Sequence, residues 1–262
     1  MGSNPNPGAF YNVGKMKLLS LNIWGGKLYE ELIRFLEHQA RDVDVFCFQE
    51  VFDEKDNPSF HAWEGAVPDI YDRLCGILTD FNVYLGEPYT SFGERLAIFV
   101  RKGVDVKGNG EVILCEQRLP YDGKTPIDVG SNLQWLELYA GGHRITLANV
   151  HGLWQPKSKD DSNETIEQSR KIIEFLGQRG GEKILCGDLN LDLATKSVAI
   201  LDGSMRDLIK EYGIASTRNS FAHPLAGNFA DYTFASRELK VNAFSVPSDV
   251  VSDHQAMLLE FG

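Results

Sequence analysis

Carboxylates, amides and histidines follow or precede several short apolar runs in this sequence, where the end of a strand would hold them rigidly. They are Asn22, Glu50, His151, Asp188 with Asn190, and the pair Asp253-His254. Side chains placed in this way can converge at one edge of a sheet. Their oxygen atoms suit Mg²⁺ (or Mn²⁺), because Mg²⁺ keeps several waters and often takes only one or two protein carboxylates. A zinc site would need cysteine or more histidine, so the pattern favours a hard divalent cation.

The charge balance limits the substrates that this chemistry could serve. The chain of 262 residues carries 26 basic and 37 acidic residues, a net charge of −11. Without the four acidic residues assigned below to the site, 33 acidic residues still face 26 basic ones, and the net charge is −7. Proteins that grip nucleic acid through its phosphates usually have a basic face. The composition therefore argues against avid non-specific DNA binding but leaves a local basic groove open.

Cysteine usage and the N-terminus indicate a reducing compartment. Cys47, Cys75, Cys115 and Cys186 are widely spaced and form no CxxC pair, which argues against zinc ribbons and redox dithiols. The sequence has no secretory signal and no apolar run near the ~18 residues that a membrane span requires. We therefore expect a cytoplasmic, monomeric protein with no transmembrane segment. Residues 1–15, rich in Gly, Pro and Asn, are predicted to form a flexible leader.

Hydrophobic periodicity predicts the elements that must position these side chains. Apolar runs predict strands at 16–23, 43–48, 96–100, 133–139, 144–150, 183–186, 232–235, 241–246 and 256–261. Helical spacing predicts helices at 28–39 and 164–178 and a helical stretch near 197–212. Gly141-Gly142 between two strands is a hairpin signal. No repeat or linker divides 16–262, which favours one mixed α/β domain with two facing sheets and helices outside.

Six short motifs in this order resemble the endonuclease/exonuclease/phosphatase family. They are Leu21-Asn22-Ile23-Trp24, Phe48-Gln49-Glu50-Val51, Asn149-Val150-His151-Gly152, Gly187-Asp188-Leu189-Asn190, Asp231-Tyr232 and Ser252-Asp253-His254. Each motif alone is a weak signal, but six with family-like order and spacing are specific, and they cover nearly all of 16–262. The resemblance implies a four-layer α/β sandwich with a metal site at one end of the facing sheets. It also implies that Glu50 is the main metal ligand, with Asn22 and Asp253 nearby.

The same resemblance implies roles for the other site residues in phosphoester hydrolysis. Asp188 would activate or orient the attacking water, and Asn190 would help to position the phosphate. His254, oriented by Asp231, would stabilise charge on a phosphoryl oxygen or assist proton transfer. His151 would contact the phosphate or assist the leaving group. These roles are chemically reasonable, since a histidine beside a carboxylate is biased toward its protonated form and a metal ion neutralises an anionic phosphoester.

Simpler structural roles compete with these functional ones. Asn22 and Asp188 could be ordinary turn residues, and His151 could be a hydrogen-bonded structural histidine; the ordered motif series favours function. Trp24 and Trp154 could line the substrate mouth or pack in the core. The pair Asp160-Asp161 is expected to be a solvated charge pair in a loop.

Several functions fit the motifs. The first is a Mg²⁺-dependent phosphodiesterase or nuclease in which water attacks phosphorus in line. The second is a lipid phosphodiesterase, because 22–25 and 49–52 are also similar to neutral sphingomyelinases and the acidic charge suits a zwitterionic substrate; no apolar membrane-docking hairpin supports it. A phosphatase acting on small phosphomonoesters is the third. A catalytically dead binding module is the alternative from another class, but Glu50, Asp188 and His254 are all present.

Overall fold

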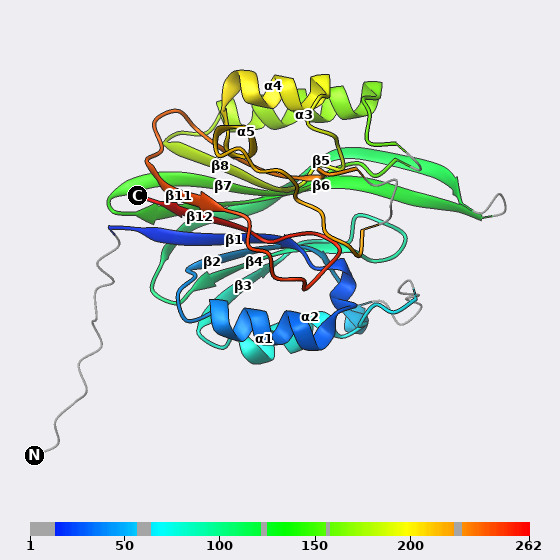
Figure 1. The fold of residues 1–262 in the computed structure, drawn as a ribbon, viewed down its shortest axis with the longest axis horizontal. Helices are drawn as coiled ribbons and strands as arrows, with labels where there is room; N and C mark the ends of the chain where they lie inside the picture. Colours follow the sequence, from blue (N-terminus) through cyan, green and yellow to red (C-terminus); the bar gives the residue numbers. More distant parts are fainter. Residues whose placement is uncertain (1–13, 57–63, 122–124, 156–157, 223–226) are drawn as a thin grey trace, which may run out of the picture.

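The computed structural model describes residues 14–56, 64–121, 125–155, 158–222 and 227–262. Most of the predicted leader, residues 1–13, therefore lies outside the described residues. Two six-stranded mixed sheets face each other, and helices cover the outer side of each (Figure 1). The predicted four-layer α/β sandwich is confirmed. Within the described ranges, no helix has the length and apolar character needed to cross a membrane.

The first sheet has the strand order β11-β12-β1-β2-β4-β3. Its central strands β1 and β2 are parallel and its other neighbours are antiparallel. The helices α1 and α2 cover its outer face (Figure 1). The bounds of these elements are β1 (Met16–Asn22), α1 (Tyr29–Gln39), β2 (Val45–Val51), α2 (Ile70–Ile77), β3 (Phe81–Leu85), β4 (Arg95–Arg101), β11 (Val241–Ser245) and β12 (Met257–Phe261), with short 3₁₀ turns η1 (Trp24–Gly26) and η2 (Glu54–Asp56).

The second sheet has the order β5-β6-β7-β8-β10-β9 and also contains one parallel pair, β7 and β8. The helices α3, α4 and α5 lie on its outer side (Figure 1). The predicted Gly-Gly hairpin joins β6 to β7, with Ala140 opposite His143. The bounds are β5 (Asp105–Tyr121), β6 (Thr125–Ala140), β7 (His143–His151), α3 (Asn163–Gly177), β8 (Glu182–Asp188), α4 (Lys196–Ser204), β9 (Arg206–Asp207), α5 (Leu208–Glu211) and β10 (Asp231–Ala235).

The central strands are apolar on both faces because both faces are buried. In β1, Leu18 packs in the core between the sheets, whereas Leu19 and Leu21 pack against α1 and α2. Successive side chains of a strand point to opposite faces, so a strand covered on both sides reads as a continuous apolar run. The same arrangement buries Cys47 and Cys186 as free thiols in the inter-sheet core.

Two expectations about the elements were incomplete or wrong. The helical stretch predicted near 197–212 is broken, because Arg206–Asp207 pairs with β10 as the short strand β9. Asp207 then caps α5 by accepting a hydrogen bond from the backbone N–H of Ile209 at 2.9 Å. The strands β3 and β5 were not predicted at all. Both lie at sheet edges, where half-exposed positions carry polar residues and the apolar signal is weak.

The topology brings the polar strand ends to one end of the molecule. The carboxyl ends of the parallel pair β1/β2 carry Asn22 and Glu50, and those of the parallel pair β7/β8 carry His151 and Asp188. Strand β10 is antiparallel to β8, so its first residue, Asp231, lies opposite Asp188. Strand β12 is antiparallel to β1, which brings 253–254, just before β12, to the same end.

The turn after β1 is held in a conformation that only a glycine fits. Gly25 has φ +58°, and a Cβ there would lie 2.7 Å from the Phe52 ring and 2.8 Å from the Ala66 methyl carbon. Trp24 precedes it with φ +52°, and its backbone N–H donates to Asn22 Oδ1 at 3.0 Å. The turn therefore couples backbone conformation to the orientation of a predicted site residue.

We expect Gly25→Ala to lower the free energy of unfolding more than Gly213→Ala does. Gly213 has a similar φ of +64° but open space around it, so its substitution should cost only the left-handed conformation, about 1–2 kcal/mol. Gly25→Ala adds steric overlap worth roughly 1–3 kcal/mol. Urea denaturation of both variants measures the difference, and equal losses would contradict the packing argument.

Candidate active site

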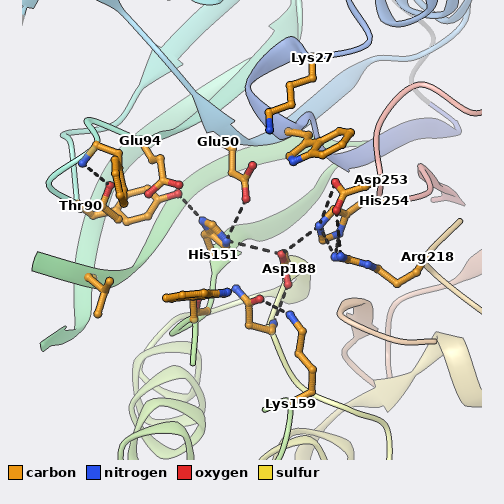
Figure 2. Close-up of a pocket in the computed structure, with 18 residues that line it drawn as sticks. Lys27, Glu50, Thr90, Glu94, His151, Lys159, Asp188, Arg218, Asp253 and His254 are labelled. Carbon is orange, nitrogen blue, oxygen red and sulfur yellow. Dashed lines mark hydrogen bonds and ion pairs between the residues drawn. The ribbon is translucent and has the colours of Figure 1, made fainter. Parts of the chain in front are cut away.

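All eight predicted site residues meet at the shared end of the two sheets, in and around a cavity of about 300 Å³. Figure 2 labels Glu50, His151, Asp188, Asp253 and His254 among the residues that line it. Asn22 and Asp231 lie behind its surface, each hydrogen-bonded to residues that line it. The six predicted residues that line the cavity are Glu50, His151, Asp188, Asn190, Asp253 and His254.

The amide of Asn22 links the two sheets at this site. Its Nδ2 donates to Glu50 Oε1 at 2.8 Å and to Asp188 Oδ2 at 3.1 Å. Glu50 belongs to the first sheet and Asp188 to the second. Because Asn22 Oδ1 is occupied by the Trp24 backbone N–H, the amide is oriented with its two donors toward the carboxylates. Asn22 therefore sets the separation between two carboxyl groups from different sheets.

Glu50 is a partly buried carboxyl group, and one of its two oxygen atoms has no hydrogen-bond partner among the described residues. That oxygen, Oε2, is itself buried. Burial, reinforced by the charge of the neighbouring Glu94, raises the pKa of Glu50 to about 8. Burial likewise raises the pKa of Glu94 to about 7. A buried acidic group of this kind is costly to ionise unless a cation joins it.

The arrangement of donors fits a divalent cation. Possible ligand atoms of Glu50, His151 and Asp188 all lie within 4.8 Å of one another, and so do those of Asp188, Asp231 and His254. In the second group, Asp231 and His254 are already bonded to each other. The first group contains the unpaired Glu50 oxygen and is therefore the better candidate. The carboxylate oxygens of this group are chemically suited to Mg²⁺ or Mn²⁺.

Asp188 remains ionised because positive groups surround it. Burial by itself would raise its pKa, but the charges of His254 and Lys159 outweigh burial and hold the pKa well below its usual range. Its Oδ1 accepts the backbone N–H of Asn190 at 2.7 Å. Asn190 has φ +57°, uncommon for a residue with a side chain, and its Nδ2 donates to the carbonyl of Gly152 at 3.1 Å.

His254 and Asp231 form a buried ion pair. Nδ1 of His254 lies 2.9 and 2.8 Å from the two Asp231 carboxylate oxygens. Burial alone would lower the pKa of His254, but the carboxylates of Asp231 and Asp253 outweigh it and raise the pKa to about 9. Nε2 of His254 lies 3.6 Å from Asp188 Oδ2. Arg218 covers this side: its Nη1 lies 2.5 Å from Nε2, where its positive charge opposes the protonation of His254, and its Nη2 donates to Asp253 Oδ2 at 2.9 Å.

His151, by contrast, is neutral. Burial lowers its pKa to about 4, and the Tyr89 hydroxyl lies 2.5 Å from its Nδ1. Because burial also raises the pKa of Tyr89, that hydroxyl keeps its proton and donates it to Nδ1. The imidazole proton then sits on Nε2, which lies 3.8 Å from Glu50 Oε1 and 3.6 Å from Asp188 Oδ2. The two histidines thus hold different protonation states in one cavity.

Sequence reasoning missed six polar residues that line the cavity: Lys27, Tyr89, Thr90, Glu94, Lys159 and Arg218. Glu94 had a usable signal, because it stands two residues before the apolar run 96–100, and β4 is antiparallel to β2. The other five lie in loops outside the six motifs. Trp24 and Trp154 both line the cavity, as one of their two predicted roles requires. Lys27 lies 4.5 Å above the Trp24 ring at the same rim.

Comparisons with known proteins agree with this architecture. A sequence model of the Endonuclease/Exonuclease/phosphatase family matches residues 19–254. A family protein from Bacteroides thetaiotaomicron superposes with a TM-score of 0.69 at 18% identity, covering 94% of this chain and 97% of its own. A mannosyl-6-phosphatase from the same organism gives 0.68 at 18% identity over 94% and 99% of the two chains. Truncated Caenorhabditis elegans TDP2 gives 0.63 at 20% identity over 95% and 98%. A search of curated proteins found no significant match.

We expect Asp231→Asn to lower the pKa of His254 from about 9 toward its usual 6.5, because Asp231 is the largest factor raising it. Histidine ring NMR titration of the metal-free protein measures this shift. The remote Asp202→Asn should leave the pKa unchanged. Because the pKa is raised on folding, the stabilisation from His254 is complete below pH 6.5 and is lost as the pH rises through about 9. A variant that keeps the wild-type titration would refute the assigned role of Asp231.

Proposed function

The chain belongs to the endonuclease/exonuclease/phosphatase family of phosphoester hydrolases, and we propose that it is a Mg²⁺- or Mn²⁺-dependent phosphodiesterase. The proposed reaction is in-line attack of water on phosphorus. The observation that carries the proposal is the completeness of the site: one cavity joins an under-compensated acidic group on Glu50, an ionised Asp188 and a charged His254. A dead binding module would have no need to keep all three.

Glu50 and Asp188 would hold the cation through their carboxylate oxygens, and the resemblance adds Asn22 and Asp253 as nearby groups. His151 lies beside these two carboxylates with its proton on Nε2. The charge of Asp253 does reach Glu50, whose pKa it helps to raise. The bound ion would neutralise the phosphate and polarise its phosphorus centre.

The remaining residues have distinct tasks in this proposal. Asp188, ionised and about 3.6 Å from both histidines, accepts a hydrogen bond from the attacking water and orients it. Asn190 has one amide proton on the Gly152 carbonyl and a second available for a phosphate oxygen. Charged His254 stabilises negative charge on the phosphoryl group. Neutral His151 offers its Nε2 proton near the leaving group.

The shape and charge of the second cavity beside the site favour a phosphodiester substrate whose substituent is neutral or cationic. The cavity shares Tyr89, Thr90, Val129 and Gly130 with a second cavity of about 800 Å³, so groups can extend from more than one side of the phosphate. The charged side chains described in the second cavity are all acidic: Glu87, Glu111, Glu116 and Asp128. A polyanionic strand would be repelled there. A lipid headgroup or small diester therefore suits this groove better than nucleic acid.

Hydrolysis of bis-p-nitrophenyl phosphate and p-nitrophenyl phosphate, with Mg²⁺, Mn²⁺ or chelator, tests the proposal. We expect chelator-sensitive cleavage that prefers the diester. Glu50→Gln and His254→Ala should each lower kcat/KM about a hundredfold or more, because each removes charge stabilisation at the reacting group.

Glu54→Gln is the matched control, since Glu54 is exposed and outside the cavity. Calorimetric titration with Mn²⁺ should show weaker binding to Glu50→Gln than to wild type. Preference for the monoester would replace the diesterase proposal by a phosphatase. Wild-type protein that hydrolyses neither substrate, or loses nothing on chelation, would contradict the proposed chemistry.

A further inference from the structure

Residues 158–162, which form the loop just before α3, place Lys159 at the active-site cavity (Figure 2). The carbonyl of Lys159 accepts the backbone N–H of Asp192 at 2.9 Å, which ties this loop to the segment after β8. Ser162 then caps α3 by accepting the backbone N–H of Thr165. The backbone of Lys159 is therefore held close to two rigid elements.

Asp161 provides a second anchor for the same loop. Its Oδ2 accepts the backbone N–H of Lys196 at 2.7 Å, and its Oδ1 accepts the backbone N–H and the hydroxyl of Ser197 at 2.9 and 2.6 Å. The expectation that Asp160 and Asp161 form a solvated pair was wrong for Asp161, because it binds the N-terminus of α4. These contacts preorganise Lys159.

The ammonium group of Lys159 is largely buried, yet its hydrogen-bond partner is a neutral amide. Its Nζ donates to Asn190 Oδ1 at 2.5 Å. Within the described chain, no carboxylate lies within ion-pair distance of it, whereas Arg218 is paired with Asp253 at 2.9 Å. Burial lowers the pKa of Lys159, because the surrounding groups do not fully compensate the positive charge of the ammonium group. Two of its three N–H donors remain for another ligand.

We propose that Lys159 binds a non-bridging oxygen of the substrate phosphate and at the same time orients Asn190. This inference rests on the proposed function, because it assigns a ligand to the same cavity. The anionic phosphate supplies the negative charge that Asn190 lacks, and lysine is a common phosphate ligand. The bond to Asn190 directs that amide so that its Nδ2 faces Gly152 and the cavity. Phosphate recognition in this protein therefore includes a loop cation outside the six motifs.

Lys159→Met, Lys159→Gln and Lys159→Arg separate charge from positioning. Methionine removes both the charge and the hydrogen bond to Asn190. Glutamine keeps a donor for Asn190 without charge, and arginine keeps the charge. Lys196→Met is the matched control, because the Lys196 side chain is exposed and does not line the cavity. Thermal unfolding of each variant checks that the fold is intact.

Inorganic phosphate is the probe, measured by product inhibition and by direct calorimetric titration. We expect the inhibition constant of phosphate to rise about tenfold to a hundredfold in Lys159→Met and Lys159→Gln, the usual effect of losing a hydrogen bond between charged groups. The KM for the diester should rise more than kcat falls, since the contact exists before the transition state. Lys159→Arg should retain most of the affinity, and Lys196→Met all of it.

Wild-type phosphate affinity in folded Lys159→Met would overturn the inference. Restored affinity in Lys159→Gln would also overturn it, because it would reduce Lys159 to a positioning residue for Asn190. Loss of folding in Lys159→Met would leave the glutamine and arginine variants to decide. If wild type hydrolyses no phosphoester, the proposed function fails, but the calorimetric titration still measures whether Lys159 binds phosphate.

Discussion

The hydrogen bonds of Asn22 to Glu50 and Asp188 are the contact on which the whole site depends, because they join the carboxyl groups of two sheets. Without a donor between them, ionisation of Glu50 beside the ionised Asp188 would be opposed by repulsion at the edge of the inter-sheet core. A second polar link lies one layer deeper, where Gln49 Nε2 donates to Asn149 Oδ1 at 2.6 Å. Both links join the first sheet to the second. The placement of the two sheets relative to each other therefore also fixes the geometry of the site.

Burial of charge in this region explains why similar side chains behave differently. His151 and His254 are both buried, yet burial prevails for His151 and lowers its pKa to about 4, while two carboxylates raise that of His254 to about 9. Among the acids, Asp188 is surrounded by cations and ionised, whereas Glu50 has a pKa raised to about 8. The protein thereby combines a proton donor, a charged acceptor and an acidic group that gains from a metal ion within one cavity.

The sheets provide the reacting groups, and the loops decide what reaches them. The similar structures share the sandwich at 18–20% identity, so the scaffold is retained while most side chains differ. In this chain the loops add Lys159 and Arg218 on one side of Asp188 and an acidic groove beyond Tyr89 on the other. In the proposed function, this asymmetry would separate recognition of the phosphate from recognition of the substituent.

Local sequence determined the Gly-Gly hairpin and the helices α1 and α3. It also determined which side chains lie at the strand ends. All of these features depend on neighbouring residues and on hydrophobic periodicity. The structure brings all eight site residues that the ordered motifs indicated to one end of the molecule. Only the tertiary structure decided that Arg206–Asp207 leaves the helix for β10, that β3 and β5 complete the sheet edges, and that Glu94, Lys159 and Arg218 enter the cavity. These outcomes depend on partners distant along the chain, and the energy of a buried charge is set by those partners rather than by its neighbours in sequence.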